Sequence, residues 1–148
     1  MMFTGSYVGN ADDKGRVIIP VRLRLSLGER VWVCKGVDGC LNIFTQDAWH
    51  DYTNSYISNR TLKDEKARQL QRFVFGGSHE LDVDRQGRIN LPQELLEFAG
   101  IKKDVVFAGV GSFVELWSSE AHGKETGAGD LKALMSEAVE IGKTTDEG

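Results

Sequence analysis

The sequence contains few of the residues that hold small folds together through disulfides or metal ions. Only two cysteines, Cys34 and Cys40, and three histidines occur among its 148 residues. No second cysteine pair and no nearby histidine completes a zinc-binding set. Proteins of the reducing cytoplasm rarely keep a structural disulfide. We therefore predict two buried free thiols, no metal site and no cofactor.

Long apolar runs are also missing. No stretch approaches the roughly 20 apolar residues that a membrane-spanning helix needs. The longest runs, such as residues 105–110, have the length of a strand. Residues 1–7 lack the basic region and apolar run of a secretory signal. These features predict a cytoplasmic protein with no membrane partner.

The sequence has no excess of positive charge. Its 18 Lys and Arg against 22 Asp and Glu give a net charge of −4, whereas DNA-binding domains are usually basic. Residues 123–148 carry six acids and three lysines, so this tail holds −3 and the rest of the chain only −1. Residues 12–24 are locally +2, from four cations and two acids. The net charge alone does not exclude DNA binding, because cations on one face of several copies can bind a polyanion.

Proline is scarce, and its two occurrences belong to an internal repeat. Residues 12–20 read Asp-Asp-Lys-Gly-Arg-Val-Ile-Ile-Pro, and residues 84–92 read Asp-Arg-Gln-Gly-Arg-Ile-Asn-Leu-Pro. Asp, Gly, Arg and Pro recur at one offset of 72 positions (84 − 12), with apolar residues matched between them. Four identities in one register are improbable by chance, so we infer an internal duplication.

The repeat extends along two halves, roughly residues 7–49 and 79–122. Gly28 matches Gly100, and after one inserted residue the offset becomes 73. At that offset Cys34 stands opposite Phe107 and Cys40 opposite Phe113, which indicates packing positions and not ligands. The other matched pairs are Gly36 with Gly109, residues 41–44 with 114–117, and residues 47–49 with 120–122.

Each half predicts the same order of elements. A strand leads to an Asp-x-x-Gly-Arg turn, where glycine supplies the backbone freedom of a tight turn. A short strand then ends at Pro20 or Pro92, and a helix follows over residues 21–27 or 93–99. A glycine ends each helix, and two more strands form a hairpin. Neither half has enough core alone, so we expect them to pack together with their strands exchanged.

We predict an α+β, β-rich fold in which the two halves form one barrel with short helices packed outside. Residues 1–50 are the first half, 51–76 a helical insert, 77–122 the second half and 123–148 an acidic tail. Within and beside the insert, residues 47–56 and 62–75 show helical periodicity, typical of helices that dock on the barrel or on a neighbouring subunit. The tail has an amphipathic stripe of five residues: Leu131, Leu134, Met135, Ala138 and Ile141.

The doubled Asp-x-x-Gly-Arg turn, each time followed by strand, proline and helix, is similar to the MraZ family of the AbrB-like swapped-hairpin superfamily. The resemblance covers nearly all of residues 1–122. It implies an internally duplicated (double-split) AbrB-like swapped-hairpin β-barrel. It also implies a nucleoid-associated regulator of the division and cell-wall operon, usually the regulator's own. Such regulators form ring-shaped homo-oligomers and bind short direct repeats of double-stranded DNA upstream of the operon.

The resemblance implies that Arg16 and Arg88 contact DNA. Arginine's planar fork can bind a guanine edge or a phosphate. The preceding Gly15 and Gly87 would let the backbone approach the duplex. An alternative is that both arginines only form salt bridges with the neighbouring aspartates. Lys14 and Arg85 are candidates for phosphate contacts. Asp12 and Asp84 are expected to hold the turn or to orient the arginine. Arg22 and Arg24 could also contact phosphates, but they are better explained as solvated surface cations.

Three other functions stay open. For an enzyme, Asp12 and Asp84 would form a carboxylate pair, and residues 109–111 a phosphate loop. A lone Gly-x-Gly is weak, however, and no nucleophile is set up, so we expect no catalysis and no small-molecule substrate. A ring-forming scaffold with incidental DNA binding fits the acidic charge and aromatic insert. An antitoxin-like AbrB relative would carry a single motif, and the duplication argues against it.

Overall fold

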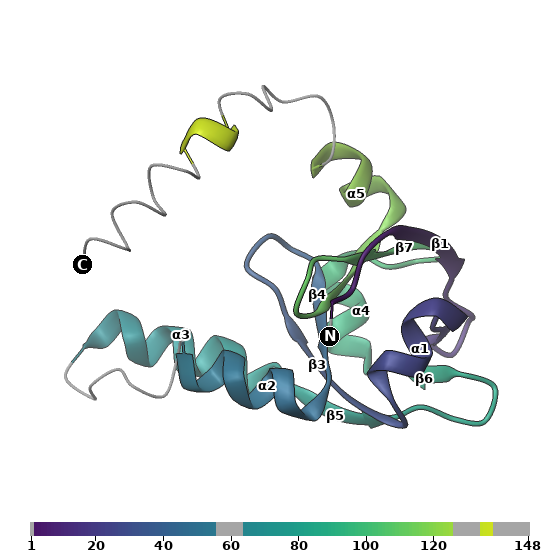
Figure 1. Ribbon diagram of the computed structural model, residues 1–148, viewed down its shortest axis with the longest axis horizontal. Helices are drawn as coiled ribbons and strands as arrows, with labels where there is room; N and C mark the ends of the chain where they lie inside the picture. The colour runs from purple at the N-terminus through teal and green to yellow at the C-terminus, as the bar shows by residue number, and fades with distance from the viewer. Residues whose placement is uncertain (1, 56–63, 126–133, 138–148) are drawn as a thin grey trace.

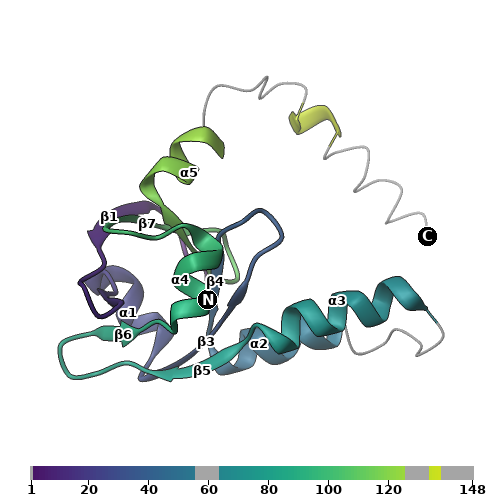
Figure 2. The ribbon, with the colours of Figure 1, turned by 180° about the vertical axis from the view of Figure 1, so that it is seen from behind.

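The computed structural model describes residues 2–55, 64–125 and 134–137 (Figures 1 and 2). Its fold is α+β and rich in strands, as predicted. The helices are α1 (Val21–Leu27), α2 (Gln46–Thr53), α3 (Glu65–Gly76), α4 (Gln93–Ala99) and α5 (Ser119–Glu125). The strands are β1 (Ser6–Asn10), β2 (Arg16–Ile18), β3 (Arg30–Lys35), β4 (Leu41–Phe44), β5 (His79–Asp82), β6 (Arg88–Asn90), β7 (Asp104–Gly109) and β8 (Val114–Ser118).

Strand pairing crosses between the two halves of the repeat. The large sheet has the order β1-β7-β8-β4-β3-β5, and every pair in it is antiparallel. Strand β1 pairs with β7, with Tyr7 opposite Phe107. Strand β5 pairs with β3, with Leu81 opposite Val31. A separate ladder joins β2 to β6. Each half thus supplies a strand to the edge of the other half's hairpin.

One core cluster is shared by both halves. Val17 and Ile89, the middle residues of β2 and β6, are fully buried, because alternate residues of a strand point to opposite faces. Pro20 and Pro92 immediately precede α1 and α4, where their fixed backbone angle suits a helix start. The buried members from these helices and the large sheet include Leu23, Leu27, Val31, Val33, Leu41, Ile43, Leu95, Val105, Phe107, Val114 and Leu116.

Both cysteines are free and buried, which confirms their predicted packing role. Cys34 lies in an aromatic cluster with Phe44, Trp49 and Val74. Burial raises the pKa of the Cys34 thiol to about 12. Burial also raises the pKa of Cys40, and the neighbouring Glu115 raises it further. Neither thiol is therefore ionised near neutral pH, which makes both poor nucleophiles.

Helix α2, which begins in the first half, and helix α3 of the helical insert extend from the body of the molecule (Figures 1 and 2). Helices α2 and α3 agree with the predicted segments to within a few residues, although residues 56 and 62–63 lie outside the described residues. Trp49 of α2 stacks on Trp32 of β3, with 5.1 Å between the ring centroids. Helix α2 is thus fixed to the sheet through aromatic contacts.

Helix α5 occupies the position of the second half that corresponds to α2, so the repeat includes this helix as well. Of the predicted stripe in the tail, Leu134 and Met135 lie in a helical turn and are exposed. Leu131, Ala138 and Ile141 lie outside the described residues. None of the helices described combines the length and apolar character that crossing a bilayer requires.

Candidate nucleic-acid interface

The first Asp-x-x-Gly-Arg turn is held together by the carboxylate of Asp12. One oxygen, Oδ1, accepts hydrogen bonds from the backbone N–H groups of Lys14 at 3.0 Å and Arg16 at 2.8 Å. The other, Oδ2, accepts from the Arg16 Nε at 2.6 Å. One aspartate therefore fixes both the turn's backbone and the direction of its arginine side chain.

The second turn repeats this arrangement. Asp84 Oδ1 accepts from the backbone N–H groups of Gln86 and Arg88, each at 2.9 Å. Asp84 Oδ2 accepts from the Arg88 Nε at 2.8 Å. The salt bridge considered from the sequence is thus present in both turns. It uses only the Nε side of each guanidinium, and the Nη groups form no hydrogen bond within the described residues. Those Nη groups are left to bind an anion or a base edge.

The glycines have a conformational and a steric role. Gly15 and Gly87 have φ angles of +80° and +81°, which side-chain-bearing residues rarely adopt. A Cβ at Gly15 would lie 2.8 Å from Leu96 Cδ1 and 3.0 Å from the Leu91 carbonyl oxygen. A Cβ at Gly87 would overlap the guanidinium of Arg24. Glycine is therefore required at both positions.

The β2–β6 ladder places the two arginines on one face. Arg16 pairs with Asn90, and Ile18 pairs with Arg88. Residues two apart on a strand, and directly opposite residues on paired strands, share a face. Since the intervening Val17 and Ile89 are fully buried, Arg16, Ile18, Arg88 and Asn90 share the outward face.

The ladder also links each strand to the other half's turn. The Ile19 N–H donates to the Gly87 carbonyl at 2.8 Å, and the Leu91 N–H donates to the Gly15 carbonyl at 2.9 Å. Both turns lie on the side of the molecule away from α2 and α3 (Figures 1 and 2). The two turns and the outward face of the ladder together form the candidate interface.

Both turn aspartates are stabilised in their ionised form. The hydrogen bond from the Arg16 backbone N–H lowers the pKa of Asp12, and the Arg16 side chain lowers it further. The Arg88 backbone N–H and then its side chain lower the pKa of Asp84 in the same way. A carboxyl group with a lowered pKa is a poor proton donor at neutral pH, which argues against the carboxylate-pair enzyme.

We predict that both carboxyl groups titrate below about 3.9, the ordinary Asp value. The folded turns hold the ionised form, so this stabilisation is complete above the ordinary pKa and is lost as the pH falls through the lowered pKa. Carboxyl carbon shifts in an NMR pH titration measure both midpoints. In Arg16→Ala, the midpoint of Asp12 should rise while that of Asp84 stays unchanged. An unchanged Asp12 midpoint would show that the Arg16 side chain does not contribute and that the backbone N–H groups alone lower this pKa.

The family follows from comparison with known proteins. A family model described as "MraZ protein, putative antitoxin-like" matches residues 2–73 and again residues 74–124. The chain belongs to the MraZ family. The two MraZ matches meet inside α3, in agreement with the internal duplication.

Relatives named "Transcriptional regulator MraZ" align over most of the chain. The protein from Clostridium botulinum (strain Eklund 17B / Type B) is 44% identical over 119 residues, covering 80% of this chain and 83% of the relative. The relative from Heliobacterium modesticaldum is 43% identical over 123 residues, covering 83% of this chain and 85% of the relative. The relative from Acetivibrio thermocellus is 39% identical over 132 residues, covering 89% of this chain and 92% of the relative.

The remaining candidate cations of this MraZ chain lie in the two turns and on α1. Lys14 and Arg85 are exposed on the first and second turn, and Arg22 is exposed on α1. Arg24 differs from the solvated surface cation that the sequence favoured. It is half-buried, and its Nε and Nη2 donate to the Ile19 carbonyl at 3.3 and 3.0 Å. The sequence did not identify Asn90 as a candidate. Its position two residues after Arg88 on the same strand nevertheless places both on one face.

The proposed phosphate loop at residues 109–111 has no free backbone donors. The Gly109 N–H donates to Gly5, and the Gly111 N–H donates to Phe3, with Phe3 donating back to Gly111. The Val110 N–H donates to Phe113 across the hairpin. Residues 109 and 111 therefore bind the chain's own N-terminal segment. Because the N–H groups of residues 109–111 already donate to carbonyl groups, the loop cannot bind a phosphate through its backbone.

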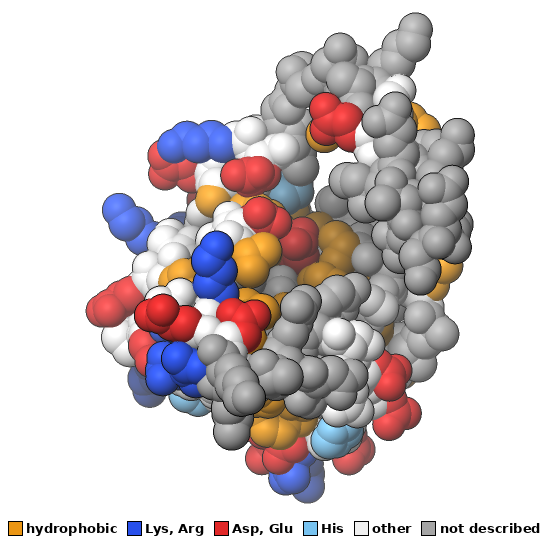
Figure 3. All heavy atoms as spheres, turned by 90° about the vertical axis from the view of Figure 1, so that its left-hand side faces the viewer, with side chains coloured by type: hydrophobic (Ala, Val, Ile, Leu, Met, Phe, Trp, Pro, Cys, Tyr) orange, Lys and Arg blue, Asp and Glu red, His pale blue; other side chains and the backbone are white. Residues whose placement is uncertain are grey.

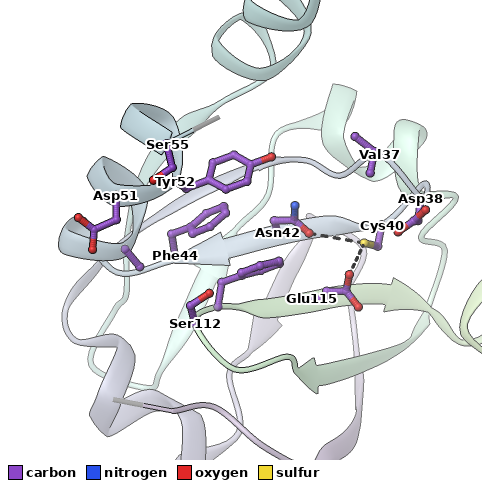
Figure 4. A pocket seen from close by; sticks show the side chains of 12 residues that line it. Val37, Asp38, Cys40, Asn42, Phe44, Asp51, Tyr52, Ser55, Ser112 and Glu115 are labelled. Carbon is purple, nitrogen blue, oxygen red and sulfur yellow. Dashed lines mark hydrogen bonds between the residues drawn. The ribbon is translucent and has the colours of Figure 1, made fainter. Parts of the chain in front are cut away.

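A cavity of about 420 Å³ has no residue of either turn in its lining. Figure 4 shows it from close by. Aromatic side chains from α2, β4 and the β7–β8 hairpin line it, together with Cys40, Asn42 and Glu115. The Cys40 thiol lies 3.6 Å from both Asn42 Oδ1 and Glu115 Oε2. Because the pKa of this thiol is raised, the cavity holds no activated cysteine.

The face at the left of Figure 1 carries charges of both signs (Figure 3). Lys and Arg side chains there lie among Asp and Glu side chains and do not gather into one basic area. A polyanion is attracted where positive potential is concentrated. This face therefore shows no concentrated positive potential that would attract a polyanion.

Proposed function

We propose that the chain is a sequence-specific DNA-binding transcription regulator. It binds short direct repeats upstream of the division and cell-wall operon, its own operon, as the MraZ resemblance implies. The proposal rests on one observation above all: two equivalent turns present Arg16 and Arg88 on one outward face. The name of the aligned relatives, transcriptional regulator, supports the same function.

Base reading and backbone binding are divided between different side chains in this proposal. Arg16 and Arg88 use their Nη edges to contact guanine edges in the major groove, since a good bidentate pair gives about 1–3 kcal/mol of discrimination. Lys14 and Arg85 bind phosphates, which contributes affinity without sequence choice. Gly15 and Gly87 support these contacts by allowing the positive φ angles of the two turns, since both glycines are buried against Leu96 and Arg24. Asp12 and Asp84 hold the arginines in position and do not touch DNA.

The fold that goes with this function is the AbrB-like swapped-hairpin barrel, duplicated within one chain. The pairing of β1 with β7 and of β5 with β3 supports it, because each joins strands from different halves. The β2–β6 ladder, which carries the two arginines, likewise takes one strand from each half. A single chain therefore supplies both members of the arginine pair.

Self-assembly into a ring, with association to the nucleoid, completes the proposal. Exposed apolar side chains near the strand edge and α1 support contacts between copies: Val8 and Leu25 are both 86% exposed. Several copies on successive repeats also bring many arginine contacts to the DNA at once, and this avidity counteracts the unfavourable net charge of −4 on each chain. The competing proposal is a ring-forming scaffold with incidental DNA binding, which the acidic balance and the aromatic α2–α3 insert favour.

Footprinting on the region upstream of the chain's own gene tests this function. We expect protection over short repeats at protein concentrations that leave a scrambled region of the same length unprotected. Deleting all but one repeat should weaken the protection, because fewer copies can bind together. Equal protection of natural and scrambled DNA, or no protection of either, would contradict the regulator function and favour the scaffold function.

A further inference from the structure

The two turns are built alike, but different side chains cover their glycines. Leu96 of α4 lies against Gly15 in the first turn, and Arg24 of α1 lies against Gly87 in the second. Arg24 and Leu96 are equivalent positions of the repeat, since 96 − 24 is the same offset of 72. Each helix therefore covers the turn of the other half, one with a leucine and one with an arginine.

The Arg24 side chain is held beside the second turn. Its Nε and Nη2 donate to the Ile19 carbonyl, and the Ile19 N–H donates to the carbonyl of Gly87 itself. Arg24 forms no ion pair with any acid in the described part of the chain, and its Nη1 forms no hydrogen bond there. A half-buried cation without an acid is stabilised when an anion binds to it.

The local charges of the two turns differ as a result. The second turn combines Arg85, Arg88 and Arg24 with one acid, Asp84, which gives a local charge of +2. Residues 12–16 of the first turn hold two cations and two acids, which gives zero, and Leu96 adds none. Potential that attracts phosphate is therefore concentrated at the second turn.

We propose that Arg24 is a phosphate-binding residue of the second turn, and that this turn carries the larger share of DNA affinity in each chain. The inference rests on the proposed function and names the DNA phosphodiester as the group that Arg24 binds. Its guanidinium binds the phosphate beside Gly87 while Arg88 reaches the base edges. The first turn contacts its bases with fewer accompanying contacts to the DNA phosphates.

The test exchanges the two equivalent residues. Arg24→Leu installs the residue of the sister position, and Leu96→Arg makes the reverse change. Each protein–phosphate contact contributes about 0.9 to the slope of log K against log salt concentration. We expect Arg24→Leu to weaken binding of the upstream duplex and flatten the slope by about 0.9 per bound chain, and Leu96→Arg to steepen it by a similar amount.

Two controls separate a phosphate contact from a structural role. Arg24→Lys keeps the charge and should keep the salt slope, although it loses the paired donors to Ile19. Thermal melting of each variant shows whether the fold is retained. If folded Arg24→Leu binds the duplex with unchanged salt slope, the proposal fails while the regulator function stands. If the wild type binds no duplex preferentially, the proposed function fails and the Arg24 contact fails with it.

Discussion

Arg88→Ala is expected to weaken binding of the upstream duplex by about tenfold or more, the loss that one good bidentate base contact produces. Arg16→Ala should have an effect of the same kind but smaller, because the second turn carries more positive charge. Arg88→Lys should recover little of the sequence preference, since an ammonium lacks the planar fork. Isothermal calorimetry with natural and scrambled duplexes measures both affinity and preference.

Arg72→Ala is the matched control for these variants. Arg72 is an exposed arginine on α3, on the side of the molecule away from both turns (Figure 1). Its loss removes the same charge from the chain and should leave the preference for the natural duplex intact. Equal losses for Arg72→Ala and Arg88→Ala would mean that net charge controls binding, and the assigned interface would then be wrong.

Phe107→Ala is expected to lower the free energy of unfolding by about 3–5 kcal/mol, the usual cost of removing a buried aromatic side chain. Phe107 is fully buried on β7, opposite Tyr7 of β1 and Leu116 of β8. The cavity therefore opens where the two halves share strands. Urea denaturation monitored by circular dichroism measures the loss.

Val37→Ala provides the comparison for Phe107→Ala. Val37 lies at the tip of the β3–β4 hairpin and is 76% exposed. Its truncation should change the free energy of unfolding by no more than about 0.5 kcal/mol. A loss below about 1 kcal/mol for Phe107→Ala would show that the contact between halves adds little to stability, contrary to the shared core.

Much of the local structure was predictable from the sequence, because local rules fix it. The helices after Pro20 and Pro92 begin and end where predicted, since a proline before the first turn and a glycine after the last one mark both boundaries. The buried state of Cys34 followed from the phenylalanine at its sister position. In each case the deciding interaction lies within a few residues or is repeated in the second half.

The contacts between halves were harder to predict. That β1 pairs with β7 depends on the packing of the whole chain, and a sequence pattern does not specify which partner a strand takes. Arg24 was misjudged as a solvated cation for a related reason. Its contact with Gly87 comes from the other half, at a distance of 63 positions (87 − 24). The leucine at its sister position, Leu96, was the available signal that this position packs.

Hydrogen–deuterium exchange with and without the upstream duplex tests most directly whether the paired turns contact DNA. We predict that bound duplex slows exchange in peptides covering residues 12–16 and 84–88, with the larger change in the second. Peptides from α3, which lies on the other side of the molecule, should exchange at an unchanged rate. Protection confined to α2 and α3, or no protection in either turn while the duplex is bound, would contradict the account.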